Sequence, residues 1–194
     1  MRKLTILTAL LGVTASPAMI FAETLEARLS GFNEVHFSGG PPATLRGAIS
    51  TGARGKFRAK LDERKGVIEY ELSYEDLRGA VTQAHIHFGQ RHTVGGIVVW
   101  LCQTVGTPAP APVDPIAITP LCPAEGKVKG VITPGQVLVQ AAQGFEGAFG
   151  DFDALVRAIR GDAAYVNVHS SLFGPGEIRG HLRSSRRDKD EHKH

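Results

Sequence analysis

The chain has 194 residues, of which 42% are hydrophobic and 21% are charged, and its formal net charge is +3. This length and composition suit one globular domain with a sizeable core. A nearly neutral chain without a dense basic patch gives no electrostatic basis for nucleic-acid binding.

The first 22 residues have the order of a secretory signal peptide. Arg2 and Lys3 form a positive region, residues 4–13 are almost wholly apolar, and Ala22 offers a small residue for cleavage before Glu23. The apolar run is shorter than the ~20 residues that span a bilayer, so we expect cleavage rather than a retained anchor. Removal of the two cations takes the net charge from +3 to +1. We therefore expect an exported protein, periplasmic or extracellular, with no transmembrane segment after cleavage.

The rest of the chain divides into a domain and a tail. We expect one folded domain at 23–183 and a charged, disordered tail at 184–194, because no apolar residue follows Leu182. His192 and His194 in this tail are weak candidates for metal binding, but a solvated tail is the favoured interpretation.

The only two cysteines are Cys102 and Cys122, and both fall in the exported part. An even count in an oxidising compartment favours a disulfide over a metal pair or two free thiols. The bond would close the Pro-rich segment 103–121 and stabilise the fold by roughly 3 kcal/mol through the unfolded state.

Alternating apolar and polar residues predict many short strands separated by Gly- and Pro-containing turns. We expect strands at 24–30, 45–50, 55–62, 67–73, 85–88, 97–101, 126–132, 165–169 and 176–182. Residues 97–101 lack polar alternation, which predicts a central strand covered on both faces. Residues 133–142 and 151–160 have helical signals, including Asp151 as a cap. The predicted fold is all-β: a Greek-key-like antiparallel β-sandwich with a late helical insertion.

Two of the predicted strand regions carry polar side chains along one face. His85 and His87 lie opposite Ile86 and Phe88, since successive strand residues point to opposite faces. The same alternation groups further polar residues on the two last strands: Tyr165, Asn167 and His169, then Glu177, Arg179 and His181. Each strand thus offers an apolar face to a core and a polar face to a binding site or a hydrogen-bonded network.

Several motifs in one order resemble the CHRD domain, a module named for chordin and found in many secreted bacterial proteins. The matching stretches are Gly31-Phe32-Asn33-Glu34-Val35, Pro41-Pro42, Ala84-His85-Ile86-His87-Phe88-Gly89, Gly96-Ile97-Val98-Val99, Ile132-Thr133, Tyr165-Val166-Asn167-Val168-His169 and Gly176-Glu177-Ile178-Arg179-Gly180-His181-Leu182. The first loop departs from the family pattern, because residues 36–40 separate the Glu-Val pair from Pro-Pro.

This resemblance implies a secreted β-sandwich and no particular reaction. The animal parent protein binds extracellular signalling ligands, but it has several domains, and that activity need not transfer to a lone domain. We therefore expect a binding or structural role without demonstrated catalysis, with an extracytoplasmic protein or ligand as partner. A partner-binding role like that of the animal protein would require an exposed apolar patch with a polar rim.

The alternative is a metalloprotein that holds copper or zinc through histidines. Two histidines two residues apart on a strand can reach one ion, and His169 or the loop residue His92 can join His85 and His87. This pattern is similar to the His-x-His strand of copper-zinc superoxide dismutases, which makes redox chemistry the one enzymatic route worth keeping. The long loop that carries further ligands in those enzymes is missing here.

A structural network is the competing interpretation of the same histidines. Neutral imidazole donates and accepts at once, so His85, His87, His169 and Asn167 can form a satisfied polar network without cofactor. Glu177 and Arg179 are expected to form an ion pair with each other or with a neighbour, and Arg179 could instead clamp an anion. Nitrogens that converge within roughly 2.0–2.2 Å of one point favour a metal. Imidazoles that bond to backbone carbonyls or point apart favour the network.

Overall fold

A computed structural model of the chain describes residues 23–38, 44–146 and 151–186. The predicted signal peptide and residues 187–194 of the predicted tail lie outside these ranges, as does Pro41-Pro42. The strands are β1 (Glu23–Ser30), β2 (Val35–Ser38), β3 (Thr44–Gly47), β4 (Arg54–Asp62), β5 (Val67–Glu75), β6 (Val81–Phe88), β7 (Gly96–Cys102), β8 (Gly126–Ile132), β9 (Ala164–Ser170), β10 (Ile178–His181) and β11 (Arg183–Ser184). The helical elements are α1 (Phe152–Arg160) and the 3-10 turns η1 (Gly31–Asn33), η2 (Pro134–Gln136) and η3 (Ala141–Gln143).

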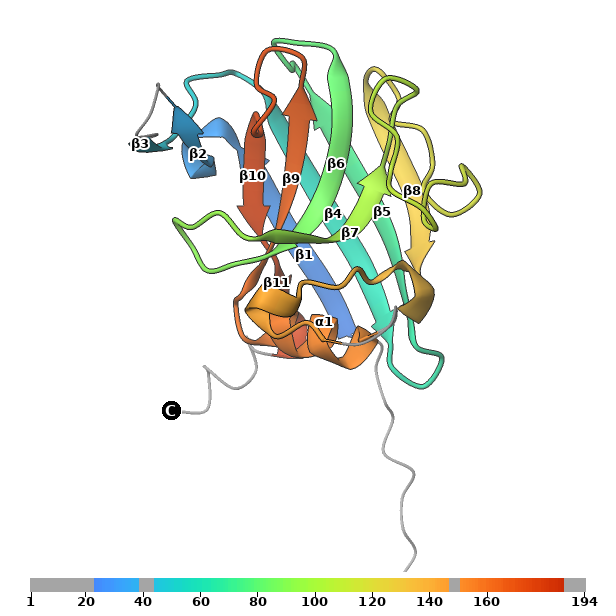
Figure 1. The fold of residues 1–194 in the computed structure, drawn as a ribbon. Helices are drawn as coiled ribbons and strands as arrows, with labels where there is room; N and C mark the ends of the chain where they lie inside the picture. Colours follow the sequence, from blue (N-terminus) through green and yellow to red (C-terminus); the bar gives the residue numbers. More distant parts are fainter. Residues whose placement is uncertain (1–22, 39–43, 147–150, 187–194) are drawn as a thin grey trace, which may run out of the picture.

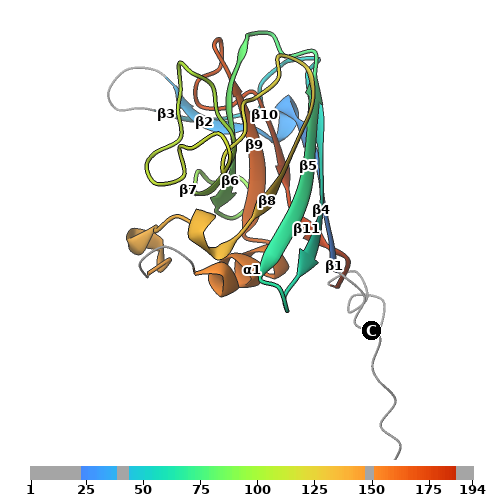
Figure 2. The same cartoon turned by 90° about the vertical axis from the view of Figure 1, so that its right-hand side faces the viewer.

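Most strands belong to one antiparallel sheet in the order β7-β6-β9-β10-β1-β4-β5-β8, and β11 pairs with β1. The sheet curls so that its layers face each other across a common core (Figure 1, Figure 2). β1 lies between β10 and β4, so the first strand of the domain pairs with one of the last. The predicted all-β antiparallel fold with one late helix is confirmed.

The prediction for residues 133–142 is wrong, because they do not form one helix. Two 3-10 turns, η2 and η3, flank an extended segment that bonds to the free edge of β7. The backbone N–H of Leu138 donates to the Val98 carbonyl at 2.8 Å, and the Gln140 side chain donates to the Ile97 carbonyl at 2.8 Å. The segment does not stay helical here, because it donates hydrogen bonds to backbone carbonyls at the edge of β7 that have no neighbouring strand within the described ranges.

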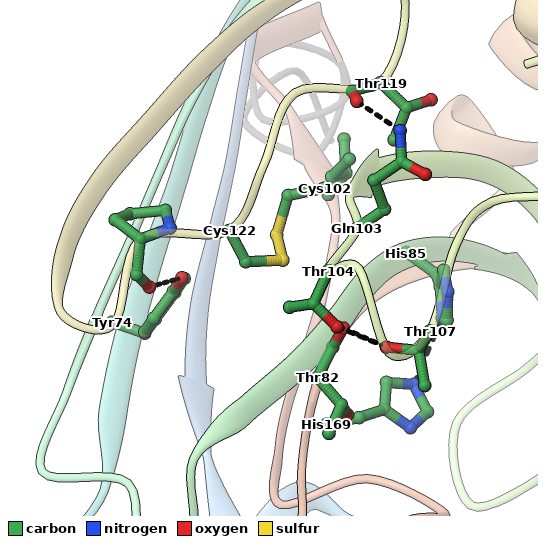
Figure 3. The surroundings of a disulfide bond; sticks show 12 residues. Tyr74, Thr82, His85, Cys102, Gln103, Thr104, Thr107, Thr119, Cys122 and His169 are labelled. Carbon is green, nitrogen blue, oxygen red and sulfur yellow. Dashed lines mark hydrogen bonds between the residues drawn. A yellow bond between two sulfur atoms is a disulfide. The ribbon is translucent and has the colours of Figure 1, made fainter. Parts of the chain in front are cut away.

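Strand β7 is covered on both faces, as predicted, but it ends the sheet instead of lying at its centre. Val98 and Val99 are fully buried. Its outer cover is the Pro-rich loop, from which Ala109 and Val113 pack against Trp100. The Cys102–Cys122 disulfide closes this loop, which confirms the predicted bond (Figure 3).

Alternation along the strands builds the core. Leu25, Phe57 and Leu72 are each at most 1% exposed, whereas the intervening residues of β1 and β4 are largely exposed. Helix α1 packs its buried face near the ends of β9 and β11 (Figure 1). The Asp151 carboxylate accepts from the Ala154 N–H at 2.8 Å, so the predicted N-cap is present.

Candidate histidine site

The site lies on the face of β6, β9 and β10 that points away from the core. Ile86, Val166 and Val168 of these strands are in the core, so the alternate side chains project outward as the sequence predicts. These outward side chains are nevertheless buried, because loops cover this face. The buried polar set is His85, His87, Tyr165, Asn167, His169 and Arg179.

The disulfide-closed loop contributes to the surroundings of the site. The hydroxyls of Thr104 and Thr107 both donate to the Thr82 carbonyl at the start of β6, which fixes the loop to that strand (Figure 3). The Trp100 ring packs edge-on against His85, with centroids 4.2 Å apart. An apolar ring and a loop therefore limit the access of water to the imidazole of His85.

Three imidazoles converge within this covered face. One ring nitrogen each of His85, His87 and His169 lies within 4.8 Å of the others, and we call these residues the histidine cluster. The closest contact is 3.1 Å, between Nδ1 of His85 and Nε2 of His169. The convergence follows from the pairing of β6 with β9, since the ring of His169 reaches diagonally toward His85, whose direct partner is Asn167.

Backbone carbonyls fix the tautomers of two of these rings. Nδ1 of His87 lies 2.9 Å from the carbonyl oxygen of Gly95, and Nδ1 of His169 lies 2.7 Å from that of Gly174. A carbonyl oxygen only accepts, so each Nδ1 must carry the proton and each Nε2 the lone pair. His85 then donates from Nδ1 to Nε2 of His169. All the remaining lone pairs of the cluster are on Nε2 atoms.

The cluster is not a satisfied network. Nε2 of His85 and Nε2 of His87 are buried and have no hydrogen-bond partner among the described residues. Each such buried group costs about 1–3 kcal/mol. Burial lowers the pKa of all three histidines, that of His87 to about 3, so the cluster is neutral at pH 7. Neutral imidazoles with free lone pairs are the form that binds transition metals.

The sequence analysis set convergent nitrogens, which favour a metal, against bonds to backbone carbonyls, which favour a network. The structure shows both features, because each imidazole has two nitrogens. His87 and His169 bond to carbonyls through Nδ1 and still present Nε2 to the cluster. Two nitrogens that each lie 2.2 Å from one ion are at most about 4.4 Å apart. Two nitrogens of the cluster that are 4.8 Å apart must therefore approach each other by about 0.4 Å to bind the same ion. Rotations of side chains can supply that closure.

The structure does not bring His92 to the cluster. It is exposed in the loop after β6, in the left-handed region with φ 63°. Asn167 is also separate from the imidazoles, because its Nδ2 donates to the Glu34 carboxylate and, at 3.5 Å, to the Ile178 carbonyl.

Glu177 and Arg179 take other partners instead of pairing with each other. Glu177, just before β10, accepts from the hydroxyls of Thr51 and Ser170 and from the Arg78 backbone N–H, so it joins the loops before β4 and β6 to the end of β9. Arg179 is 1% exposed and donates to the backbone carbonyls of the loop after β6, those of Gln90 and Thr93.

His181 lies beside Arg179, with 3.3 Å between its Nε2 and a guanidinium nitrogen. Burial and that cation lower the pKa of His181 to about 4. It therefore belongs to the edge of the polar face and not to the histidine cluster.

The sequence did not predict the contacts that two aromatic residues make with the histidines, although alternation placed Tyr165 on the polar face. Tyr165 stacks parallel to His87 with centroids 4.8 Å apart, and its hydroxyl accepts from the Gly95 N–H at 3.1 Å. Trp100 was assigned only to a covered strand. The position of Tyr165, two residues before Asn167, was the available signal, since it places the ring on the face of His169.

Comparison with family models gives one match, to the CHRD domain, over residues 25–182. Comparisons with curated proteins and with solved structures give no match. The matched region contains the histidine cluster, both cysteines and the strands of the curled sheet, except for β11 and the first two residues of β1. Within the described residues, no helix has the length and apolarity needed to cross a bilayer.

Proposed function

The chain belongs to the CHRD domain family, and on that premise we propose that it is an exported binding protein whose ligand is one copper or zinc ion. One observation carries this proposal: the histidine cluster is buried, neutral and convergent, yet two of its ring nitrogens find no partner in the part of the chain that the structure describes. A bound cation would accept the lone pairs that the protein leaves unused.

The donor set suits these metals. Imidazole nitrogen binds zinc and copper well, and catalytic zinc sites can use three histidines with a water molecule as the fourth ligand. The carbonyls of Gly95 and Gly174 act as the outer partners that orient the rings of His87 and His169. Binding of an ion through Nε2 of His169 requires that nitrogen to give up the hydrogen bond that it accepts from Nδ1 of His85.

Export is part of the proposal. The disulfide between Cys102 and Cys122 is typical of proteins in oxidising compartments. The order of charge, apolar run and small residues at 1–22 adds a sequence argument for secretion. Extracytoplasmic copper and zinc are the ions that such a protein would meet.

The test is metal analysis of the chain purified from its native compartment without chelators, followed by titration of the metal-free protein with Cu and Zn. We expect one equivalent of bound metal, and less than a tenth of that in His87→Gln and His169→Gln. Circular dichroism of each variant shows whether it is folded.

Two controls separate this site from other histidines. His92→Ala changes an exposed histidine of the neighbouring loop, and a double variant, His192→Ala with His194→Ala, removes both histidines of the tail. Both should bind metal like the wild type. If folded wild-type protein binds neither ion, the structural network is the better account and the metal proposal fails.

A further inference from the structure

We infer that the histidine cluster is built for a monovalent ion, copper(I), in preference to copper(II) or zinc(II). This inference rests on the proposed function and concerns which ion that site selects. Three features of the structure carry it: the charge of the ligands, their number and a buried cation close to them.

The ligands supply no negative charge. The cluster consists of three imidazoles, and within the described ranges no Asp, Glu or Cys joins the group. Its members are 0%, 7% and 5% exposed for His85, His87 and His169. Because the cost of moving an ion out of water rises with the square of its charge, a divalent ion is penalised about four times as much as a monovalent one.

The number of ligands points the same way. Zinc in proteins is almost always four-coordinate, and copper(II) prefers a tetragonal set of nitrogen and oxygen ligands. Here three nitrogens converge, and Trp100 packs against the ring of His85. Copper(I), a d10 ion with no tetragonal preference, is satisfied by three nitrogens alone.

A buried positive charge lies close to the cluster. Strand β9 lies between β6 and β10, so the Tyr165 ring separates His87 from Arg179. The Arg179 guanidinium carbon lies 3.3 Å from the centroid of that ring, on which His87 stacks at 4.8 Å. This buried guanidinium donates to neutral backbone carbonyls, and its Nε has no partner among the described residues. It therefore disfavours a second positive charge in the cluster.

One carboxyl group partly offsets this cation. Glu34 is 2% exposed and acts electrostatically on Arg179, but it bonds to Asn167 and not to the guanidinium. Burial raises the pKa of Glu34 to about 7, so only part of its charge is present at neutral pH. Among the charged side chains, Arg179 is the one that acts electrostatically on His87.

The experiment measures the affinity of the metal-free full chain for each ion. Copper(I) is titrated anaerobically in competition with a chromophoric copper(I) chelator, and copper(II) and zinc(II) with chelators of known affinity. We expect copper(I) to bind tighter than either divalent ion by about tenfold or more, which reverses the usual strength of copper(II) on nitrogen ligands. Copper(II) or zinc(II) binding as tightly as copper(I) would overturn the inference.

A matched pair of variants tests the role of the buried charge. Arg179→Gln removes the positive charge, whereas Arg179→Lys keeps a positive charge on a shorter side chain. We expect the preference for copper(I) to fall by roughly tenfold in Arg179→Gln and to persist in Arg179→Lys. Equal preferences in the two variants, with both folded by circular dichroism, would show that the charge does not select the ion.

The outcomes distinguish this inference from the proposed function. Failure of every ion to bind removes the metal site altogether. Tight binding of zinc(II) alone leaves the proposed function intact and removes only the selectivity for copper(I). If both variants of Arg179 unfold, the comparison of the three ions on the wild type still decides the question.

Discussion

Tyr70, on β5, donates a hydrogen bond of 2.6 Å across the interior to the backbone carbonyl of Leu101 on β7. This bond joins β7, one end of the sheet, to a strand next to the other end. Removing the hydroxyl in Tyr70→Phe leaves a buried carbonyl without its donor, so we expect a loss of about 1–3 kcal/mol of unfolding free energy. Urea denaturation measures it. An unchanged midpoint would mean that the carbonyl finds another donor.

Gly176 is a position where a side chain has no room. Its φ is 138°, and an added Cβ would lie 2.4 Å from Nδ2 of Asn167 and 2.6 Å from a carboxylate oxygen of Glu34. We expect Gly176→Ala to destabilise the fold by about 3 kcal/mol or more, through backbone strain and overpacking. Gly174→Ala is the matched control in the same loop, because nothing lies within 4 Å of its added Cβ. Equal thermal stabilities of the two variants would contradict this account.

Glu34 gives a pH dependence of known sign. Burial raises its pKa from 4.5 to about 7, so the folded state holds the proton more tightly than the unfolded state. The stabilisation is complete below about pH 4.5 and is lost as the pH rises through 7, by about 3 kcal/mol. The three histidines with a lowered pKa have the opposite effect, since the folded state loses stability as the pH falls below 6.5.

Glu34→Gln isolates this contribution. We expect its stability, relative to the wild type, to improve by about 3 kcal/mol between pH 4.5 and pH 8, measured by chemical denaturation. Glu125→Gln, at an exposed position, should follow the wild type at every pH. Parallel curves of unfolding free energy against pH for the wild type and Glu34→Gln would contradict the raised pKa of Glu34.

The disulfide is expected to stabilise the fold by limiting the unfolded chain. Cys102 and Cys122 are 20 residues apart, which corresponds to about 3 kcal/mol. The double variant Cys102→Ala, Cys122→Ala should lose about that much in guanidinium denaturation. Reduction of the wild type should give a similar loss. A much smaller loss in both experiments would show that the Pro-rich loop is held by its own contacts, such as those of Gln103.

Bound metal should stabilise the folded state. An ion that binds only the folded chain adds about 2.7 kcal/mol at a free concentration one hundred times its dissociation constant. The preferred ion should therefore raise the unfolding temperature of the wild type and of His92→Ala, and leave His169→Gln unchanged. A similar rise in His169→Gln would assign the stabilisation to another site.

The strand pattern was readable because burial follows a period of two. Ile86, Val166 and Val168 marked one face as core, and that alone placed the histidines on the other face. The same rule misplaced β7 at the centre of the sheet, because loop residues such as Val113 cover it as a second layer would. Covered strands look alike in sequence whether a sheet or a loop covers them.

The predicted helix at 133–142 failed for a different reason. Thr133 and Gln136 form a capping box, but only one turn follows. Beyond this turn, the backbone N–H of Leu138 donates to the Val98 carbonyl at the edge of β7. Local sequence does not reveal this partner, because the sheet must form before the edge of β7 exists. Partners far apart in sequence, such as Arg179 with the carbonyl of Thr93, were hidden for the same reason.

The strands that hold the three imidazoles also hold the centre of the core. Because His85 alternates with Ile86, and His169 with Val168, the spacing of the rings is set by residues that a mutation cannot easily move without unfolding the domain. The covering loops present backbone carbonyls to the site at Gly95, Gly174 and Thr93, and a carbonyl group does not depend on the side chain of its residue. Gly95 itself is constrained, because an added Cβ would lie 1.9 Å from the Phe88 carbonyl oxygen, but other side chains of these loops can change without moving the strands that carry the rings.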